Sequence, residues 1–319
     1  MSAQKGDQAF RRNDTTLGRW PEMTYAGVLS FLRRNYSRDL AGADLVISGI
    51  PFDSAVTNRT GTRLGPQAIR AASVQLAELK AFPWGFDPFE TLAAIDWGDV
   101  WLDPHHPDTV APAIEAHADA ILGAGARMLS LGGDHSVSLP LLRAHARRHG
   151  PLALIQVDAH CDTWEDDGTR LDHGTMFARA VAEGIIDVAR SSQVGLRTHN
   201  DADPDFLILA APWIHRNGID AALAAVRERA GDAPVYLSFD IDGLDPAFAP
   251  GTGTPVPGGL ASWQALEFLR GLDGLNLTGM DLVEVSPPYD HAEITALAAA
   301  TLAHDWLCLI ARQKARDAG

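Results

Sequence analysis

Short apolar runs alternate along this chain with longer segments in which apolar residues recur every three or four positions. Runs of four to nine mainly apolar residues are typical of buried strands, whereas the spacing of three and four is typical of amphipathic helices. We predict strands at residues 45–48, 128–131, 152–157, 192–196, 235–239 and 277–285. We predict helices at residues 109–122, 139–148, 219–230 and 294–310.

Near-continuous apolar strands that take turns with helices indicate a parallel sheet covered by helices on both faces. The length of 319 residues, 46% of them hydrophobic, is ample for a sizeable core. No linker-like segment interrupts the alternation. We therefore predict an α/β protein, a single-domain three-layer α/β/α fold with a mainly parallel central sheet, over residues 41–319. Residues 1–40 are predicted to form an N-terminal extension, packed on the domain or at a subunit interface.

The charge and the cysteines bear on partners and location. A net charge of -15 disfavours nucleic acid as a partner, because a phosphate backbone needs a basic stripe. The N-terminus lacks the apolar region of a signal peptide, and we found no apolar run of about 18 residues, so no membrane partner is predicted. Two cysteines, Cys161 and Cys308, are too few for a disulfide framework, and we predict a cytoplasmic location.

Polar residues follow four of the predicted strands. The apolar runs lead into GGDHS at 132–136, DAHCD at 158–162 and DID at 240–242, and the strand near Met280 reaches Glu284. Ligands of parallel sheets bind beyond the carboxyl ends of the strands. If these segments stay extended, residues two apart point the same way. We therefore expect Asp158, His160 and Asp162 to converge with Asp240 and Asp242.

So many carboxylates in one cleft need a compensating positive charge, because like charges repel and desolvation is costly. Divalent cations are the natural compensation. An oxygen-rich set with a minority of imidazole suits Mn²⁺ better than thiolate-preferring metals. The candidates exceed what one open catalytic site needs, so we predict more than one ion; the candidate ligands are His135, Asp158, His160, Asp162, Asp240 and Asp242.

These motifs resemble those of the arginase/agmatinase (ureohydrolase) family. The likeness rests on GGDH at 132–135, DAHCD at 158–162 and SFDIDGLDP at 238–246, and it extends over most of the chain, from about residue 49 to residue 297. It is closest to bacterial agmatinases through FPW at 82–84, LDHGTMF at 171–177, DPAFAPGTGTP at 245–255 and ITALA at 294–298.

The resemblance implies an arginase-like fold and a hydrolase of guanidino compounds with two Mn²⁺ per subunit. One ion would be held by His135, Asp158, Asp162 and Asp240, and the other by Asp158, His160, Asp240 and Asp242. Asp158 and Asp240 would be the bridges. A hydroxide shared by the two ions would be the nucleophile. The resemblance also implies a homo-oligomer, a trimer or hexamer.

The same resemblance implies roles for three catalytic residues. Glu284 would pair with the guanidinium of the substrate and hold its carbon over the hydroxide. Asp162 would accept a hydrogen bond from that nucleophile. His173 matches the position regarded as the proton shuttle, so it would contact the substrate and protonate the leaving amine.

The far end of the substrate is harder to predict. The loop at 57–63 should reach the mouth of the pocket, and we choose Asn58 as its substrate-binding residue. Arg59 and Arg63 would favour a distal carboxylate if they faced the pocket. Hydrolysis of agmatine to putrescine and urea is the first hypothesis. A guanidinobutyrase, which releases urea and 4-aminobutyrate, is the alternative, followed by arginase and by a non-catalytic metal-binding protein of the same fold.

Overall fold

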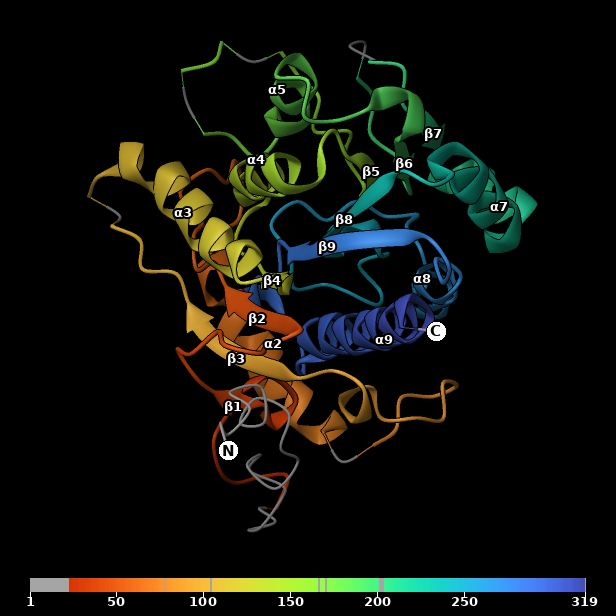
Figure 1. Ribbon diagram of the computed structural model, residues 1–319. Helices are drawn as coiled ribbons and strands as arrows, with labels where there is room; N and C mark the ends of the chain where they lie inside the picture. The colour runs from red at the N-terminus through yellow and green to blue at the C-terminus, as the bar shows by residue number, and fades with distance from the viewer. Residues whose placement is uncertain are drawn as a thin grey trace.

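A nine-stranded sheet forms the centre of the molecule in the part of the chain described by the computed structural model, which covers residues 23–77, 79–103, 105–165, 167–169, 171–200 and 204–318 (Figure 1). The strand order is β1-β3-β2-β4-β9-β8-β5-β6-β7, and every neighbouring pair is parallel. The predicted fold class is confirmed. The strands are β1 (Asn35–Tyr36), β2 (Leu45–Gly49), β3 (Ala94–Asp99), β4 (Arg127–Leu131), β5 (Ala153–Val157), β6 (Ser192–Val194), β7 (Leu207–Leu209), β8 (Pro234–Asp240) and β9 (Asn276–Val283).

Helices cover both faces of the sheet, each over its own hydrophobic cluster. One face carries α3 (Val110–Gly123), α4 (Ser138–His149) and α5 (Met176–Ala182). The other carries α2 (Gly65–Ser73), α6 (Ala211–Asn217), α7 (Ile219–Ala230), α8 (Ser262–Arg270) and α9 (Ile294–Asp317). Figure 1 shows α9 lying along the sheet beside α8.

Successive side chains along a strand point to opposite faces of the sheet and so belong to different hydrophobic clusters. In β2, Leu45 and Ile47 belong to the cluster under α9, whereas Val46 between them belongs to the cluster under α3. All three side chains are fully buried. A strand covered on both faces therefore has to be apolar at every position, which explains the continuous apolar runs in the sequence.

Helix α9 is long and apolar enough to cross a membrane, and its most apolar window has a mean hydropathy of 1.6. This corrects the expectation that no apolar stretch of that length occurs. However, 78% of the window is buried inside the protein, where Trp306 and Leu307 are fully enclosed. A core helix of a globular protein meets the same criteria, so α9 is explained by packing.

The segment before residue 41 contributes to the sheet and to the core. Strand β1 pairs with β3, and the side chains of Phe31 and Leu32 are fully buried. Residues 1–22 of the predicted extension lie outside the described residues. The boundary at residue 40 stays a prediction.

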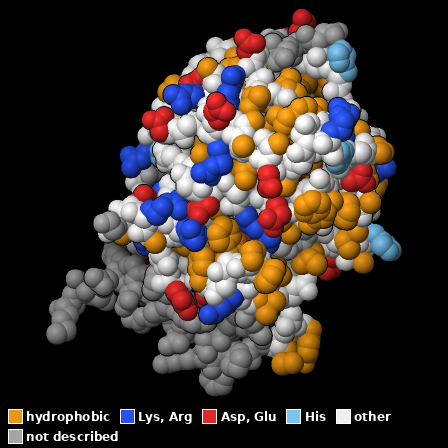
Figure 2. All heavy atoms as spheres, turned by 90° about the vertical axis from the view of Figure 1, so that its right-hand side faces the viewer, with side chains coloured by type: hydrophobic (Ala, Val, Ile, Leu, Met, Phe, Trp, Pro, Cys, Tyr) orange, Lys and Arg blue, Asp and Glu red, His pale blue; other side chains and the backbone are white. Residues whose placement is uncertain are grey.

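The surface mixes charges of both signs with apolar groups. On the face seen in Figure 2, acidic and basic side chains are interspersed, and hydrophobic side chains gather between them. Trp263 and Phe248 are 60% and 40% exposed. Exposed apolar groups of this size are common at subunit contacts, but the oligomeric state stays a prediction.

Candidate metal centre and substrate cavity

The strand order gathers the polar segments at one edge of the sheet. Strands β4 and β5 follow each other along the chain, yet β9 and β8 lie between them in the sheet. The segments that leave β4, β9, β8 and β5 are therefore neighbours at the carboxyl ends of the strands. Such a reversal in strand order leaves a crevice at this edge, the usual ligand site of an open parallel sheet.

The first ligand segment is a tight bend, whereas we expected an extended strand. Strand β5 ends at Val157, and the backbone amide of His160 donates to Asp158 Oδ1 over 2.6 Å. Asp162 lies in the left-handed region, with φ of 54°. The side chains of Asp158, His160 and Asp162 still face the same site, but through this bend and not through alternation along a strand.

The second ligand segment makes a 3-10 turn. Strand β8 ends at Asp240, and η9 (Ile241–Gly243) follows directly. Asp240 Oδ1 accepts from the amide of Asp242 over 2.7 Å and so caps the turn. The expected alternation is again wrong, because the second carboxylate is delivered by the turn.

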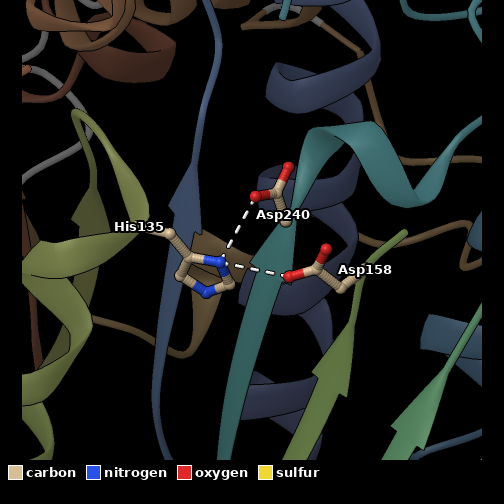
Figure 3. Close-up of side chains that lie close together, drawn as sticks. All are labelled: His135, Asp158 and Asp240. Atoms are coloured by element: carbon tan, nitrogen blue, oxygen red, sulfur yellow. Dashed lines mark ion pairs between the residues drawn. The ribbon is translucent and has the colours of Figure 1, made fainter. Parts of the chain in front are cut away.

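Two overlapping groups of side chains could each hold a metal ion. The first consists of His135, Asp158 and Asp240, and Figure 3 shows both carboxylates pointing toward the imidazole. His135 Nδ1 lies 3.1 Å from Asp158, 3.3 Å from Asp240 and also 2.9 Å from Asp162. The second group consists of Asp158, His160 and Asp242. Asp158 belongs to both groups.

The hydrogen bonds behind His135 leave Nδ1 free for a cation. Ser238 donates its hydroxyl hydrogen to Asp281 over 2.7 Å, so it accepts the hydrogen of His135 Nε2 at 2.8 Å. A neutral His135 then presents the Nδ1 lone pair to carboxylate oxygens, and this buried atom has no hydrogen-bond partner among the described residues. Only a cation or a proton makes such an arrangement favourable. The donor set therefore fits divalent metal ions.

The electrostatics of the acids point the same way. Burial raises the pKa of Asp162 to about 7, and the charge of Asp158 adds to the rise. Burial, followed by repulsion from Asp242, raises the pKa of Asp240 well above its ordinary value. Within the described residues no Lys or Arg forms an ion pair with these carboxylates. Repulsion among these buried acids is therefore relieved by a proton or by a bound cation.

Glu284 and His173 form a second unit beside the cluster. Glu284 Oε1 accepts from the amide of His135 over 2.9 Å and from His173 Nδ1 over 3.0 Å. The buried Oε2 atom has no partner in the described part of the chain. Glu284 has a φ of 62°, in the left-handed region that non-glycine residues seldom adopt.

His173 is held on its other side by Thr57. The amide of Thr57 donates to Nε2 over 3.1 Å, and its hydroxyl lies 3.0 Å from the same atom. Burial alone would lower the pKa of His173, but the hydrogen bond to Glu284 and the charges of nearby acids raise it to about 9. The Thr57 amide opposes protonation, because it needs the lone pair of Nε2.

A cavity of about 320 Å³ opens over these groups. Its described lining includes no Lys or Arg. It is formed by Thr57, His160, Asp162, Trp164, Glu165, Asp172, His173, Gly174, Thr175, Asp240, Thr254 and Glu284.

The predicted specificity loop lies differently from our expectation. Asn58 does not line the cavity, and its amide donates to the carbonyl of Gly253 over 3.1 Å. Arg59 stacks over the ring of Tyr289, 4.9 Å from its centroid, and Arg63 pairs with Asp53. Neither arginine lines the cavity. The substrate-binding role of Asn58 stays a prediction.

Sequence reasoning did not single out seven residues of the described lining, among them Trp164, Glu165, Asp172 and Thr57. Trp164 and Glu165 lie two and three residues after the DAHCD motif, Asp172 precedes His173, and Thr57 opens the loop at 57–63. Their closeness to known motifs was the available signal for the first three. For Thr57, the only signal was the expectation that the loop at 57–63 reaches the mouth of the pocket.

Comparison with known proteins gives the family. The model of the arginase family matches residues 43–308. An agmatinase from Chromobacterium violaceum is 60% identical over 311 residues, which are 97% of this chain and 96% of that protein.

Two solved structures agree with this assignment. A hypothetical agmatinase from Burkholderia thailandensis superposes with a TM-score of 0.92 at 60% identity, covering 93% of this chain and 94% of that one. The proclavaminate amidino hydrolase of Streptomyces clavuligerus gives 0.87 at 38% identity, covering 91% and 99%. The predicted resemblance is confirmed: the chain belongs to the arginase family and is a ureohydrolase, an enzyme that acts on C–N bonds.

Proposed function

We propose that this enzyme hydrolyses agmatine to putrescine and urea with two bound Mn²⁺ ions. The observation that carries the choice of substrate is the charge of the cavity. Its described lining holds carboxylates from the ligand cluster outward to Glu165 and Asp172, and no Lys or Arg. Agmatine is positively charged at both ends, so both ends suit such a lining.

The metal ions would be held by the cluster at the sheet edge. We propose His135, Asp158, Asp162 and Asp240 for one ion and Asp158, His160, Asp240 and Asp242 for the other. Membership of Asp158 in both groups supports its role as a bridge. The bridging role of Asp240 rests on the family resemblance, because Asp240 belongs to the first group alone. Two bound ions would lower the pKa of a shared water, so that hydroxide is available near neutral pH.

Glu284 would bind the guanidinium. Its Oε1 atom is occupied by two N–H donors, whereas the buried Oε2 has no partner among the described residues, and Glu284 lines the cavity. A guanidinium N–H would satisfy this oxygen through a charge-assisted hydrogen bond. Asp162, also on the cavity wall, would accept a hydrogen bond from the attacking oxygen.

His173 would move the proton that the leaving amine needs. Glu284 holds the Nδ1–H, so Nε2 is the atom that takes up a proton and passes it to the amine nitrogen. The amide of Thr57 occupies that lone pair in the resting site. Displacement of this contact by substrate or by proton uptake would free Nε2 for transfer.

The outer wall would select the distal amine. Glu165 is exposed, Asp172 is half-buried, and the ring of Trp164 lies beside His160, with 6.4 Å between the ring centroids. Carboxylates and an indole face attract an ammonium group and repel a carboxylate. Arg59 and Arg63, which would have favoured 4-guanidinobutyrate, have other partners.

Urea release tests the proposal. The protein is treated with a chelator, desalted, and assayed with agmatine before and after the addition of Mn²⁺. We expect no turnover without metal and equal amounts of urea and putrescine with it. Agmatine turnover that persists in the metal-free protein would refute the metal-dependent mechanism. Equal inactivity toward every guanidino compound after loading would favour the non-catalytic alternative.

Cytoplasmic location and assembly into trimers or hexamers belong to the same proposal. Cys161 and Cys308 are both free and buried, which supports a reducing compartment.

A further inference from the structure

Arg197 makes an unusual set of contacts behind the ligand cluster. It follows β6, and its half-buried guanidinium donates to five backbone carbonyl oxygens. Nε binds Val256 at 2.9 Å, Nη1 binds Gly195 at 3.1 Å and Gly243 at 3.4 Å, and Nη2 binds Asp242 at 2.5 Å and Leu244 at 3.1 Å.

Three of these carbonyls belong to the segment that carries the ligand Asp242. Residues 242–244 turn away from the end of β8, so the ladder with β9 no longer supplies donors for their carbonyls; the carbonyl of Gly243 also accepts from the amide of Leu260 over 3.1 Å. A buried carbonyl without a donor is costly. The planar guanidinium, with five N–H groups in fixed directions, meets this need from one side chain. Its charge is also attracted by Asp242 and Asp158.

The backbone beside the guanidinium holds the other ligand segment. The amides of Arg197 and Thr198 donate to the carbonyl of Ala159 over 3.0 and 3.2 Å, and the Thr198 hydroxyl adds a bond of 3.0 Å. Ala159 lies between Asp158 and His160, and its own amide donates to Asp242 Oδ1 over 3.0 Å. Residues 197 and 198 thus bind both ligand segments at once.

The neighbouring glycines leave the room that these contacts need. A Cβ atom on Gly259 would lie 2.7 Å from Arg197 Nη2, and one on Gly243 would lie 3.0 Å from the amide nitrogen of Asp158. Such distances are shorter than ordinary carbon contacts, so a side chain at either position would push the guanidinium or the two ligand segments apart.

We propose that Arg197 is a positioning residue, which fixes the 158–160 and 242–244 segments relative to each other so that Asp158, His160 and Asp242 can bind metal together. The proposal rests on the metal site of the proposed function. It does not depend on which guanidino compound is the substrate.

Metal binding gives a direct test. The metal-free full-length protein is titrated calorimetrically with Mn²⁺ as the wild type and as Arg197→Met, Arg197→Lys and Arg227→Met. Arg227 is a matched control, because its Nη1 also donates to two carbonyls, those of Gly271 and Asp273, but touches no ligand segment.

We expect Arg197→Met to bind Mn²⁺ about 10- to 100-fold more weakly, the range for residues that orient metal ligands. The Mn²⁺ affinity of Arg197→Lys should fall at least about tenfold, since an ammonium group keeps the charge but cannot reach all of the carbonyls. The Mn²⁺ concentration for half-maximal urea release should rise in parallel, whereas kcat at saturating Mn²⁺ should recover to near the wild-type value. Arg227→Met should bind Mn²⁺ like the wild type.

Wild-type Mn²⁺ affinity in a folded Arg197→Met protein would overturn the proposal, as would full rescue by lysine. If the methionine variant does not fold, the lysine variant decides by the same titration. Failure of the wild type to bind Mn²⁺ would refute the proposed metal site as well. Equal binding by the wild type and the Arg197 variants would refute the role of Arg197 alone.

Discussion

The substitution Glu284→Gln should nearly abolish catalysis while leaving the metal content unchanged. Glutamine keeps the shape of the side chain, but one of its two terminal atoms is an NH₂ donor. Glu284 Oε1 already receives N–H groups from His135 and His173, so the amide oxygen has to stay there. The NH₂ group then replaces Oε2, the only oxygen left for the guanidinium.

The expected loss follows from that geometry. The variant loses a charge-assisted hydrogen bond to the substrate. Its side-chain NH₂ group would also face an N–H group of the guanidinium, so two donors would meet in a buried site. Removal of one partner from a buried charged pair costs about 2 to 5 kcal/mol. Because the contact orients the carbon for attack, we expect kcat/KM to fall by roughly 10² to 10³ or more, with kcat carrying most of the change.

The assay compares kcat and KM for agmatine, together with Mn²⁺ content, in Glu284→Gln and in Glu165→Gln. The second variant makes the same chemical change at the exposed mouth of the same cavity. Solvent screens the charge there, so KM should rise by about two- to fivefold with little change in kcat. A Glu284→Gln enzyme with more than a tenth of wild-type kcat/KM would refute the role given to Oε2.

Three further predictions concern metal, proton transfer and pH. Asp240→Asn should lower bound Mn²⁺ from about two per chain to less than one, measured by metal analysis after desalting, because Asp240 is taken as a bridge; retention of both ions would contradict the bridge. His173→Ala should keep its metal while kcat falls by roughly 10² to 10⁴, and loss of metal together with activity would make His173 structural. His145 is fully buried, and burial lowers its pKa to about 4, from an ordinary value of 6.5. Between those values only the unfolded chain takes up the proton, so this group destabilises the fold as pH falls, by about 2 kcal/mol at pH 5. The free energy of unfolding, measured in urea for the wild type and His145→Gln at pH 7 and pH 5, should fall less on acidification in the variant. Equal falls in the two proteins would contradict the buried neutral imidazole.

The central strands were predictable because both of their faces are covered, so their apolar runs are unbroken. The predicted strands at 128–131 and 235–239 match β4 and β8 closely. Strand β3 was missed because it contains Asp96 and Gly98. Asp96 is fully buried and binds Arg70 of α2 at 2.8 Å. The cost of burying that carboxylate is offset by a partner 26 residues away, which no local pattern reveals.

The residues of the candidate site were easier to predict than the backbone conformation that brings them together. The sequence indicated that Asp158, His160 and Asp242 lie together, and they do. Convergence arises from a bend and a 3-10 turn, because β5 ends five residues before Asp162 and β8 ends two residues before Asp242. The contact of Thr57 with His173 joins residues 116 positions apart. Only the folded chain brings them together.

The most direct test of the central claim is the ratio of kcat/KM for agmatine to that for 4-guanidinobutyrate, measured by urea release with the Mn²⁺-loaded enzyme. The two substrates share the guanidinium and the chain length and differ in the charge of the distal group. An acidic cavity whose described lining holds no Lys or Arg should favour agmatine by at least about tenfold, or roughly 1.4 kcal/mol of transition-state discrimination. A preference for 4-guanidinobutyrate would contradict the assignment of agmatine as substrate.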